Sequence, residues 1–162
     1  MRKPRQHDIF QVKREPGLSN LLVGQAKAAD VMRKTSANGL HLLPSGALPP
    51  NPAELLGSSR FADLLKALGD HFDWIVIDSP PVLAVTDAVV VAHRTNGVLY
   101  VVGSEQIGRQ MAVRAVEKIQ AAKGNIIGAV LNRVNVDRNP YYYSHYYRKD
   151  YANYYASTET KT

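Results

Sequence analysis

A dense group of tyrosines lies near the C-terminal end of the sequence. Eight of the nine tyrosines fall within residues 141–155. They are Tyr141, Tyr142, Tyr143, Tyr146, Tyr147, Tyr151, Tyr154 and Tyr155. They come in blocks that match neither the strand nor the helix period, so we do not expect them to pack in a core. Accessible hydroxyls can accept phosphoryl groups, each of which adds about −1.5 to −2 charges. By composition alone, three interpretations stay open: a phosphoacceptor, a sticky low-complexity tail, or a strip that stacks on single-stranded nucleic acid.

A carboxylate follows the most apolar run in the middle of the chain. Asp78 comes directly after residues 74–77 (Trp-Ile-Val-Ile) and precedes Ser79-Pro80-Pro81. Such a run predicts a buried strand, and ligands of open α/β sheets bind at the carboxyl ends of strands. A carboxylate there can hold Mg²⁺ beside nucleotide phosphates, as a Walker B element does. A strand followed by a capping Asp is the alternative, and only the adjoining Ser-Pro-Pro makes the pattern specific.

A third candidate is Asn132-Arg133, at the end of the last expected strand. An Asn side chain offers a paired donor and acceptor that could read a base. An ordinary exit from a strand is the simpler interpretation of this pair.

The elements that must position these residues alternate along the chain. We expect strands at 40–43, 74–77, 98–102 and 126–131, and helices at 52–57, from Ser58 or Ser59, from Thr86 or Asp87, and at 109–123. Asn51 is expected to cap the first of these helices, with Pro52 in its first turn. Phe61, Leu64, Leu65 and Leu68 share one face of the second, and Met111, Ala115, Ile119 and Ala122 form a stripe on the last. This alternation predicts a doubly wound, mostly parallel α/β sheet with right-handed crossovers.

Composition excludes several classes of protein. The absence of cysteine excludes disulfides and thiolate metal sites, and the five histidines show no metal-ligand spacing. No apolar run approaches the roughly 20 residues that span a bilayer, and no signal-peptide core follows Met1, so we expect a cytoplasmic protein. Residues 1–34 carry eight Lys/Arg and three Asp/Glu. This basic segment could meet phosphates, an acidic partner or a membrane surface, although a solvated surface is the simpler interpretation.

Taken together, the sequence resembles the bacterial tyrosine kinases of the capsular exopolysaccharide family. The features that carry the resemblance are Arg2-Lys3-Pro4, residues 16–20, residues 48–56, residues 77–81, residues 131–134 and the terminal tyrosines. The resemblance divides the chain into a partial P-loop-type kinase domain (1–136) and a Tyr-rich tail (137–162). It implies ATP and Mg²⁺ as cofactors, Asp78 as the Mg²⁺ residue, and Asn132 and Arg133 beside the adenine. Arg2 would close an Asp-x-Asp-x-Arg motif near the nucleotide, and the eight tail tyrosines would be the phosphoacceptors.

The resemblance also implies partners. Kinases of this family phosphorylate neighbouring copies of themselves and work with a membrane-embedded polysaccharide co-polymerase that activates them. Such a kinase is peripheral at the inner face of the plasma membrane and acts in capsule or exopolysaccharide synthesis and export. Nucleic acid is not an expected partner, because the tail carries four Lys/Arg against three Asp/Glu.

The sequence departs from the family at the phosphate-binding loop. A P-loop needs a Gly-rich turn followed by Lys and Ser or Thr, and no such sequence occurs in the chain. We hypothesise that Met1 is an internal methionine of a longer protein, which in-frame coding sequence upstream would support and an in-frame stop would refute. The chain alone is expected to be inactive. The sheet would lack its P-loop strand and leave open strand edges and exposed apolar surface.

Two other functions stay open at this stage. A partition-type ATPase would share the Walker B run, but the tyrosine tail argues against it. A non-catalytic phosphoacceptor or docking module needs no P-loop, so the chain as written fits it chemically.

Overall fold

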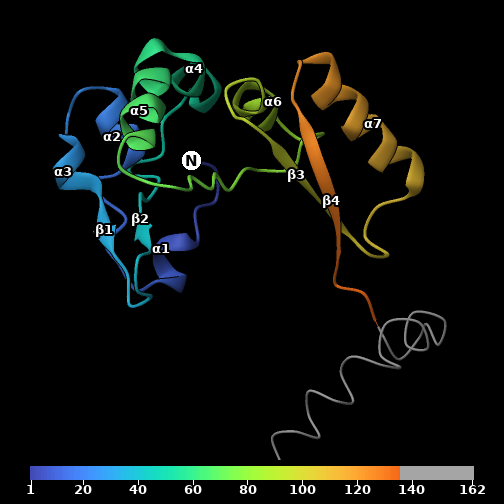
Figure 1. Ribbon diagram of the computed structural model, residues 1–162, viewed down its shortest axis with the longest axis horizontal. Coiled ribbons are helices and arrows are strands. Elements are labelled where there is room, and N and C mark those ends of the chain that lie inside the picture. Colours follow the sequence, from blue (N-terminus) through green and yellow to red (C-terminus); the bar gives the residue numbers. More distant parts are fainter. Residues whose placement is uncertain (136–162) are drawn as a thin grey trace, which may run out of the picture.

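The computed structural model describes residues 1–135, which form an α/β structure of short helices and two small sheets (Figure 1). The tyrosine cluster and the expected tail at 137–162 lie outside the described residues. Within residues 1–135, no helix has the length and apolar character needed to cross a membrane.

The first third of the chain forms short helices and one small antiparallel sheet. Its elements are α1 (Gln6–Ile9), α2 (Leu18–Leu22), α3 (Ala28–Val31), β1 (Arg33–Lys34) and β2 (His41–Leu42). Arg33 lies opposite Leu42 and Lys34 lies opposite His41. The strand expected at 40–43 is therefore confirmed in place, but it is only two residues long because β1 offers only two pairing positions.

Helix α2 begins against the loop that follows β2. The backbone N–H of Leu18 donates to the carbonyl of Pro44 at 2.8 Å. A Cβ atom added at Gly17 would collide with the backbone of Pro44 and Gly46. The two segments can approach this closely only because position 17 is glycine.

Two helices follow, α4 (Pro52–Gly57) and α5 (Ser59–Gly69). Ser58 caps α5 as expected, because its Oγ accepts a hydrogen bond from the N–H of Phe61 at 3.3 Å. The expected side-chain cap on α4 is wrong. Asn51 makes no capping hydrogen bond, and its Nδ2 instead donates to the carboxylate of Glu54 at 2.9 Å.

The main buried cluster joins four helices, the last of which is α6 (Asp87–Ala92). Its members are Leu22 of α2, Leu56 of α4, Phe61 of α5 and Val91 of α6. Burial of each such side chain contributes about 1.5–3 kcal/mol. The cluster therefore fixes α6 firmly against the N-terminal helices.

Residues 98–132 form a parallel β–α–β unit. It consists of β3 (Val98–Gly103), α7 (Arg109–Ala121) and β4 (Ile126–Asn132). The strands and helix expected here are confirmed. Ala115 and Ile119 of the expected stripe are buried, at 2% and 1% exposed, whereas Met111 is 44% exposed. The chain is thus α/β with parallel strands, as the alternation predicted.

The strand expected at 74–77 does not form. The segment is extended and crosses between the N-terminal helices and the β3–β4 pair (Figure 1), but no strand pairs with it among the described residues. Trp74 is 86% exposed and Val76 is 89% exposed, so the predicted burial on both faces is wrong. A strand requires a hydrogen-bonding neighbour, and residues 1–135 place none beside this segment.

Apolar surface is exposed on the β3–β4 sheet as well. The exposed fractions are 57% for Leu99, 54% for Val101, 67% for Ile127 and 49% for Leu131. Among residues 1–135, each strand has one neighbour in this sheet, so its other edge is open. The prediction of open strand edges and exposed apolar surface is therefore confirmed in the described residues.

Candidate nucleotide and metal site

Asp78 lies at the end of the extended segment, where it is exposed and touches the start of the chain. Its Oδ2 accepts a hydrogen bond from Nε2 of Gln6 at 2.8 Å. Gln6 is the first residue of α1. The N-terminal segment therefore lies directly beside the carboxylate that the sequence marks as the metal ligand.

Arg2 is held by a second carboxylate, that of Asp87. Nε of Arg2 donates to Oδ2 of Asp87 at 2.9 Å, and Nη2 donates to Oδ1 at 3.1 Å. Asp87 is 2% exposed and is the first residue of α6. These hydrogen bonds raise the pKa of Arg2 above its usual value. Two parallel N–H···O bonds make this a bidentate pair, the geometry that orients both partners most strictly.

The amino group of Met1 interacts with both carboxylates. Burial lowers the pKa of this amino group, and the charges of Asp87 and Asp78 oppose the shift. Met1, Arg2, Gln6, Asp78 and Asp87 thus form one cluster, which brings together two of the predicted site residues.

Asn132 and Arg133 lie elsewhere, at the carboxyl end of β4. Oδ1 of Asn132 accepts from the backbone N–H of Arg133 at 2.8 Å, and its carbonyl accepts from the N–H of Ser104 at 2.8 Å. Both side chains are exposed. No hydrogen bond or ion pair in residues 1–135 joins them to Asp78. The predicted base-binding role for this pair stays a prediction.

The carboxylate of Asp78 suits Mg²⁺ as a single ligand. Within residues 1–135, no three His, Asp or Glu side chains lie together so as to hold a metal ion. Proteins commonly hold Mg²⁺ through one or two carboxylates plus substrate phosphates and water. An exposed Asp78 fits that arrangement, provided that Gln6 gives up or shares the carboxylate.

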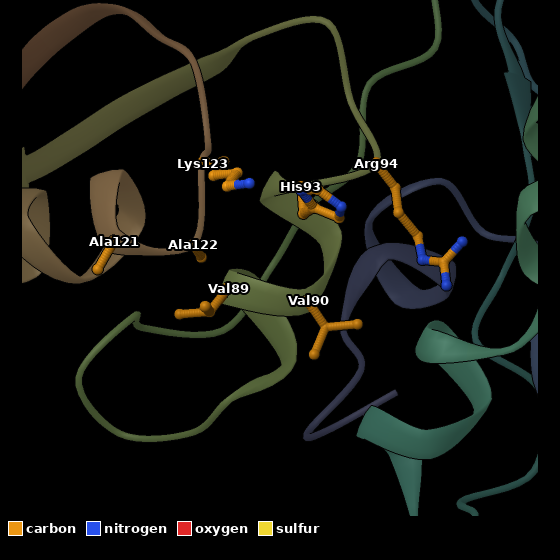
Figure 2. Close-up of a pocket in the computed structure, with 7 residues that line it drawn as sticks. All are labelled: Val89, Val90, His93, Arg94, Ala121, Ala122 and Lys123. Atoms are coloured by element: carbon orange, nitrogen blue, oxygen red, sulfur yellow. The ribbon is translucent and has the colours of Figure 1, made fainter.

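One hollow in the described part of the molecule lies away from this cluster. It is a shallow depression of about 440 Å³ at the C-terminal ends of α6 and α7 (Figure 2). Valines and alanines form its floor, and His93, Arg94 and Lys123 stand at its rim. Basic residues are favoured at helix C-termini because they complement the last carbonyl groups. The basic rim is therefore explained without a ligand.

Sequence reasoning did not identify the roles of Gln6 and Asp87. Asp87 is expected only as a helix-capping residue, and Gln6 carries no motif. Their partners lie 72 and 85 residues away along the chain. No local periodicity or spacing reports contacts at such separations.

Solved structures define the class of protein to which this fold and site belong. A chimeric CapA2B2 protein superimposes with a TM-score of 0.79 at 40% identity, covering 82% of this chain and 59% of that one. The kinase domain of the Escherichia coli tyrosine kinase ETK superimposes with a TM-score of 0.77 at 34% identity, covering 81% and 51%. The VpsO kinase domain superimposes with a TM-score of 0.78 at 35% identity, covering 83% of this chain and 66% of that domain. The fold is that of bacterial tyrosine-kinase domains.

Curated relatives give the family, although no family model matches the chain. CapB of Staphylococcus aureus, provisionally named a tyrosine-protein kinase, is 40% identical over 150 residues, which cover 93% of this chain and 65% of CapB. The tyrosine-protein kinase YwqD of Bacillus subtilis is 30% identical over 150 residues, covering 93% and 63%. The chain belongs to the bacterial tyrosine kinases of the capsule family and spans less than two thirds of the length of these relatives.

Proposed function

We propose that the chain is part of a protein-tyrosine kinase that acts in capsular or exopolysaccharide biosynthesis and export. The observation that carries the proposal is the 40% identity to CapB across 93% of this chain. The exposed carboxylate of Asp78, at the end of its extended segment, supports it. The complete domain would be a doubly wound sheet of the P-loop type, of which β3 and β4 are two strands.

The proposed roles follow the positions of the side chains. Asp78 holds Mg²⁺, and Asn132 and Arg133 lie beside the adenine of ATP. Arg2 stands near the nucleotide, held in place by Asp87. Bound Mg²⁺ neutralises charge on the phosphates during transfer. The tyrosines between 141 and 155 accept the phosphoryl groups, which turns a nearly neutral tail strongly acidic.

The proposal extends to partners and location. The whole kinase associates with a membrane-embedded polysaccharide co-polymerase that activates it, and with other copies of itself. Through the activator it is peripheral at the inner face of the plasma membrane.

A phosphotyrosine assay with Mg²⁺-ATP tests the proposal. The chain is incubated alone and with full-length YwqD, and a variant with Phe at all eight tail tyrosines is the control. We expect no signal from the chain alone, because its sequence contains no P-loop. In the mixture, we expect YwqD to phosphorylate the chain. We expect no phosphorylation of the variant that has Phe at all eight tail positions. If the mixture gives no phosphotyrosine signal on the chain although the chain is folded and YwqD is active, the acceptor role is contradicted.

One alternative has a specific observation in its favour. A non-catalytic phosphoacceptor module also fits the missing P-loop sequence. Adding the portion of CapB that this chain does not cover separates the two functions, because a partial kinase would gain activity and an acceptor module would not.

A further inference from the structure

Two hydrogen-bonded contacts connect the first six residues to both ends of the loop at 78–87. Arg2 binds Asp87 at the far end of this loop, and Gln6 binds Asp78 at its beginning. The two contacts lie four residues apart on the N-terminal segment. Residues 2–6 therefore form a strap across the loop, and we use that name for them below.

The Asp87 end of the strap is fixed by the core. Asp87 opens α6, and Val91 of the same helix belongs to the main buried cluster. Both oxygens of the buried Asp87 carboxylate receive N–H groups from one guanidinium. A planar guanidinium bound in this way has its orientation set as well as its position. Arg2 is thus anchored to a rigid element.

Beyond the packing of Ile77 against the main buried cluster, little else fixes the Asp78 end. The residues before Asp78 belong to no ladder of strands, and Trp74 and Val76 are almost fully exposed. Within residues 1–135, the Asp78 carboxylate accepts one side-chain hydrogen bond, from Gln6 of the strap. The direction of this carboxylate thus depends on the strap. The strap is tied to the core through Asp87 and through Met1, which packs against the main buried cluster.

We propose that Asp87 is a positioning residue for Asp78, acting through Arg2 and Gln6. The proposal rests on the proposed function, in which Asp78 is the Mg²⁺ ligand. Asp87 itself would not bind the metal or the phosphates, because both its carboxylate oxygens are used by Arg2. It sets where the exposed carboxylate stands relative to the folded core.

A distance measurement between two spin labels tests this directly in the full 162-residue chain. The chain has no cysteine, so Ser79→Cys and Glu117→Cys place one label beside Asp78 and one on the exposed side of α7. The measurement needs no nucleotide. The measurement can therefore contradict the positioning role of Asp87 without bearing on the kinase proposal, which the phosphotyrosine assay tests.

Three variants and one control decide the outcome. In Asp87→Asn and Arg2→Lys we expect the 79–117 distance distribution to widen at least about twofold, because local order is lost without global unfolding. Arg2→Lys keeps the positive charge but loses the bidentate geometry. We therefore do not expect the lysine to restore the narrow distance distribution of the unmodified chain. Gln6→Ala should widen the distribution in the same way. Asp63→Asn, the same chemical change on the exposed face of α5, should leave it unchanged.

Amide exchange separates positioning from general destabilisation. In Asp87→Asn we expect faster exchange in α1 and unchanged exchange in β3, α7 and β4. In Gln6→Ala we expect the widened distribution without faster exchange in α7 or β4. An unchanged 79–117 distribution in Arg2→Lys and Gln6→Ala would overturn the proposal, even where Asp87→Asn fails to fold.

Discussion

Two carboxylates nine residues apart differ in their environment and therefore in what they can do. Asp87 is buried, and both its oxygens are used by Arg2. Asp78 is exposed, and within residues 1–135 its carboxylate accepts one side-chain hydrogen bond, from a neutral amide. A buried carboxylate needs a charged partner to remain ionised, whereas an exposed one keeps its charge in water and can accept a ligand. The environment therefore assigns Asp87 a structural contact and leaves Asp78 available for chemistry.

The most deeply buried aliphatic side chain near the parallel strands gives a prediction at this scale. Ile119 is 1% exposed and lies against Gly124 and Ala92. We expect Ile119→Ala to lower the stability of the β3–α7–β4 unit by about 2–5 kcal/mol, because it leaves a cavity. Amide exchange of β4 would measure the loss. Gln120→Ala, at the exposed neighbouring position, is the control. Equal effects of the two substitutions would contradict the claim that burial of Ile119 stabilises this unit.

The helices differ in how their first turns are stabilised. Ser58 accepts from the N–H of Phe61 and donates to the carbonyl of Leu55 at 2.7 Å, so it joins α4 to α5. Asn51 and Thr86 precede α4 and α6 without a side-chain capping bond. Helices α4 and α6 are six residues long each, so tertiary packing must hold them.

The cap of α5 gives a prediction at the scale of the element. We expect Ser58→Ala to destabilise the first turn of α5 by about 1 kcal/mol, because the N–H of Phe61 loses its acceptor. The measurement is amide exchange at residues 59–63. Ser59→Ala is the matched control, since Ser59 is exposed and lies inside the helix. If the two variants exchange alike, Ser58 is not the effective cap.

At the scale of the whole molecule, the described chain has a well-formed cluster on one side and uncovered strands on the other. The core of Leu22, Leu56, Phe61 and Val91 lies among the helices. The extended segment and the β3–β4 pair have open edges and exposed apolar side chains. Exposed apolar patches of this kind favour association with other surfaces.

This exposed apolar surface gives a prediction at the scale of the whole molecule. We expect the isolated chain to bind a hydrophobic dye such as ANS and to unfold without a sharp thermal transition, because apolar strand faces stay in water. The double substitution Leu99→Thr and Val101→Thr should lower dye binding without loss of helix content. Leu56→Ala, in the core, should raise it. A sharp cooperative transition with no dye binding would contradict the prediction.

Local patterns in the sequence determined the elements whose stability is mostly local. Apolar runs and helical stripes predicted β3, β4, α5 and α7, and Ser58 was one of the two residues predicted to cap α5. The resemblance in motifs predicted the family. These features follow from periodicity and from short-range hydrogen bonds, which the order of residues alone specifies.

Only the tertiary structure decided which residues meet across the chain. The apolar run at 74–77 has a strand's sequence, yet it stays unpaired because a strand also needs a neighbour that residues 1–135 do not supply. The Arg2–Asp87 and Gln6–Asp78 contacts depend on how the N-terminal strap crosses the loop at 78–87. The partners in these contacts are separated by 85 and 72 positions in the sequence. Such contacts are set by the packing of whole elements, and nothing in local spacing encodes them.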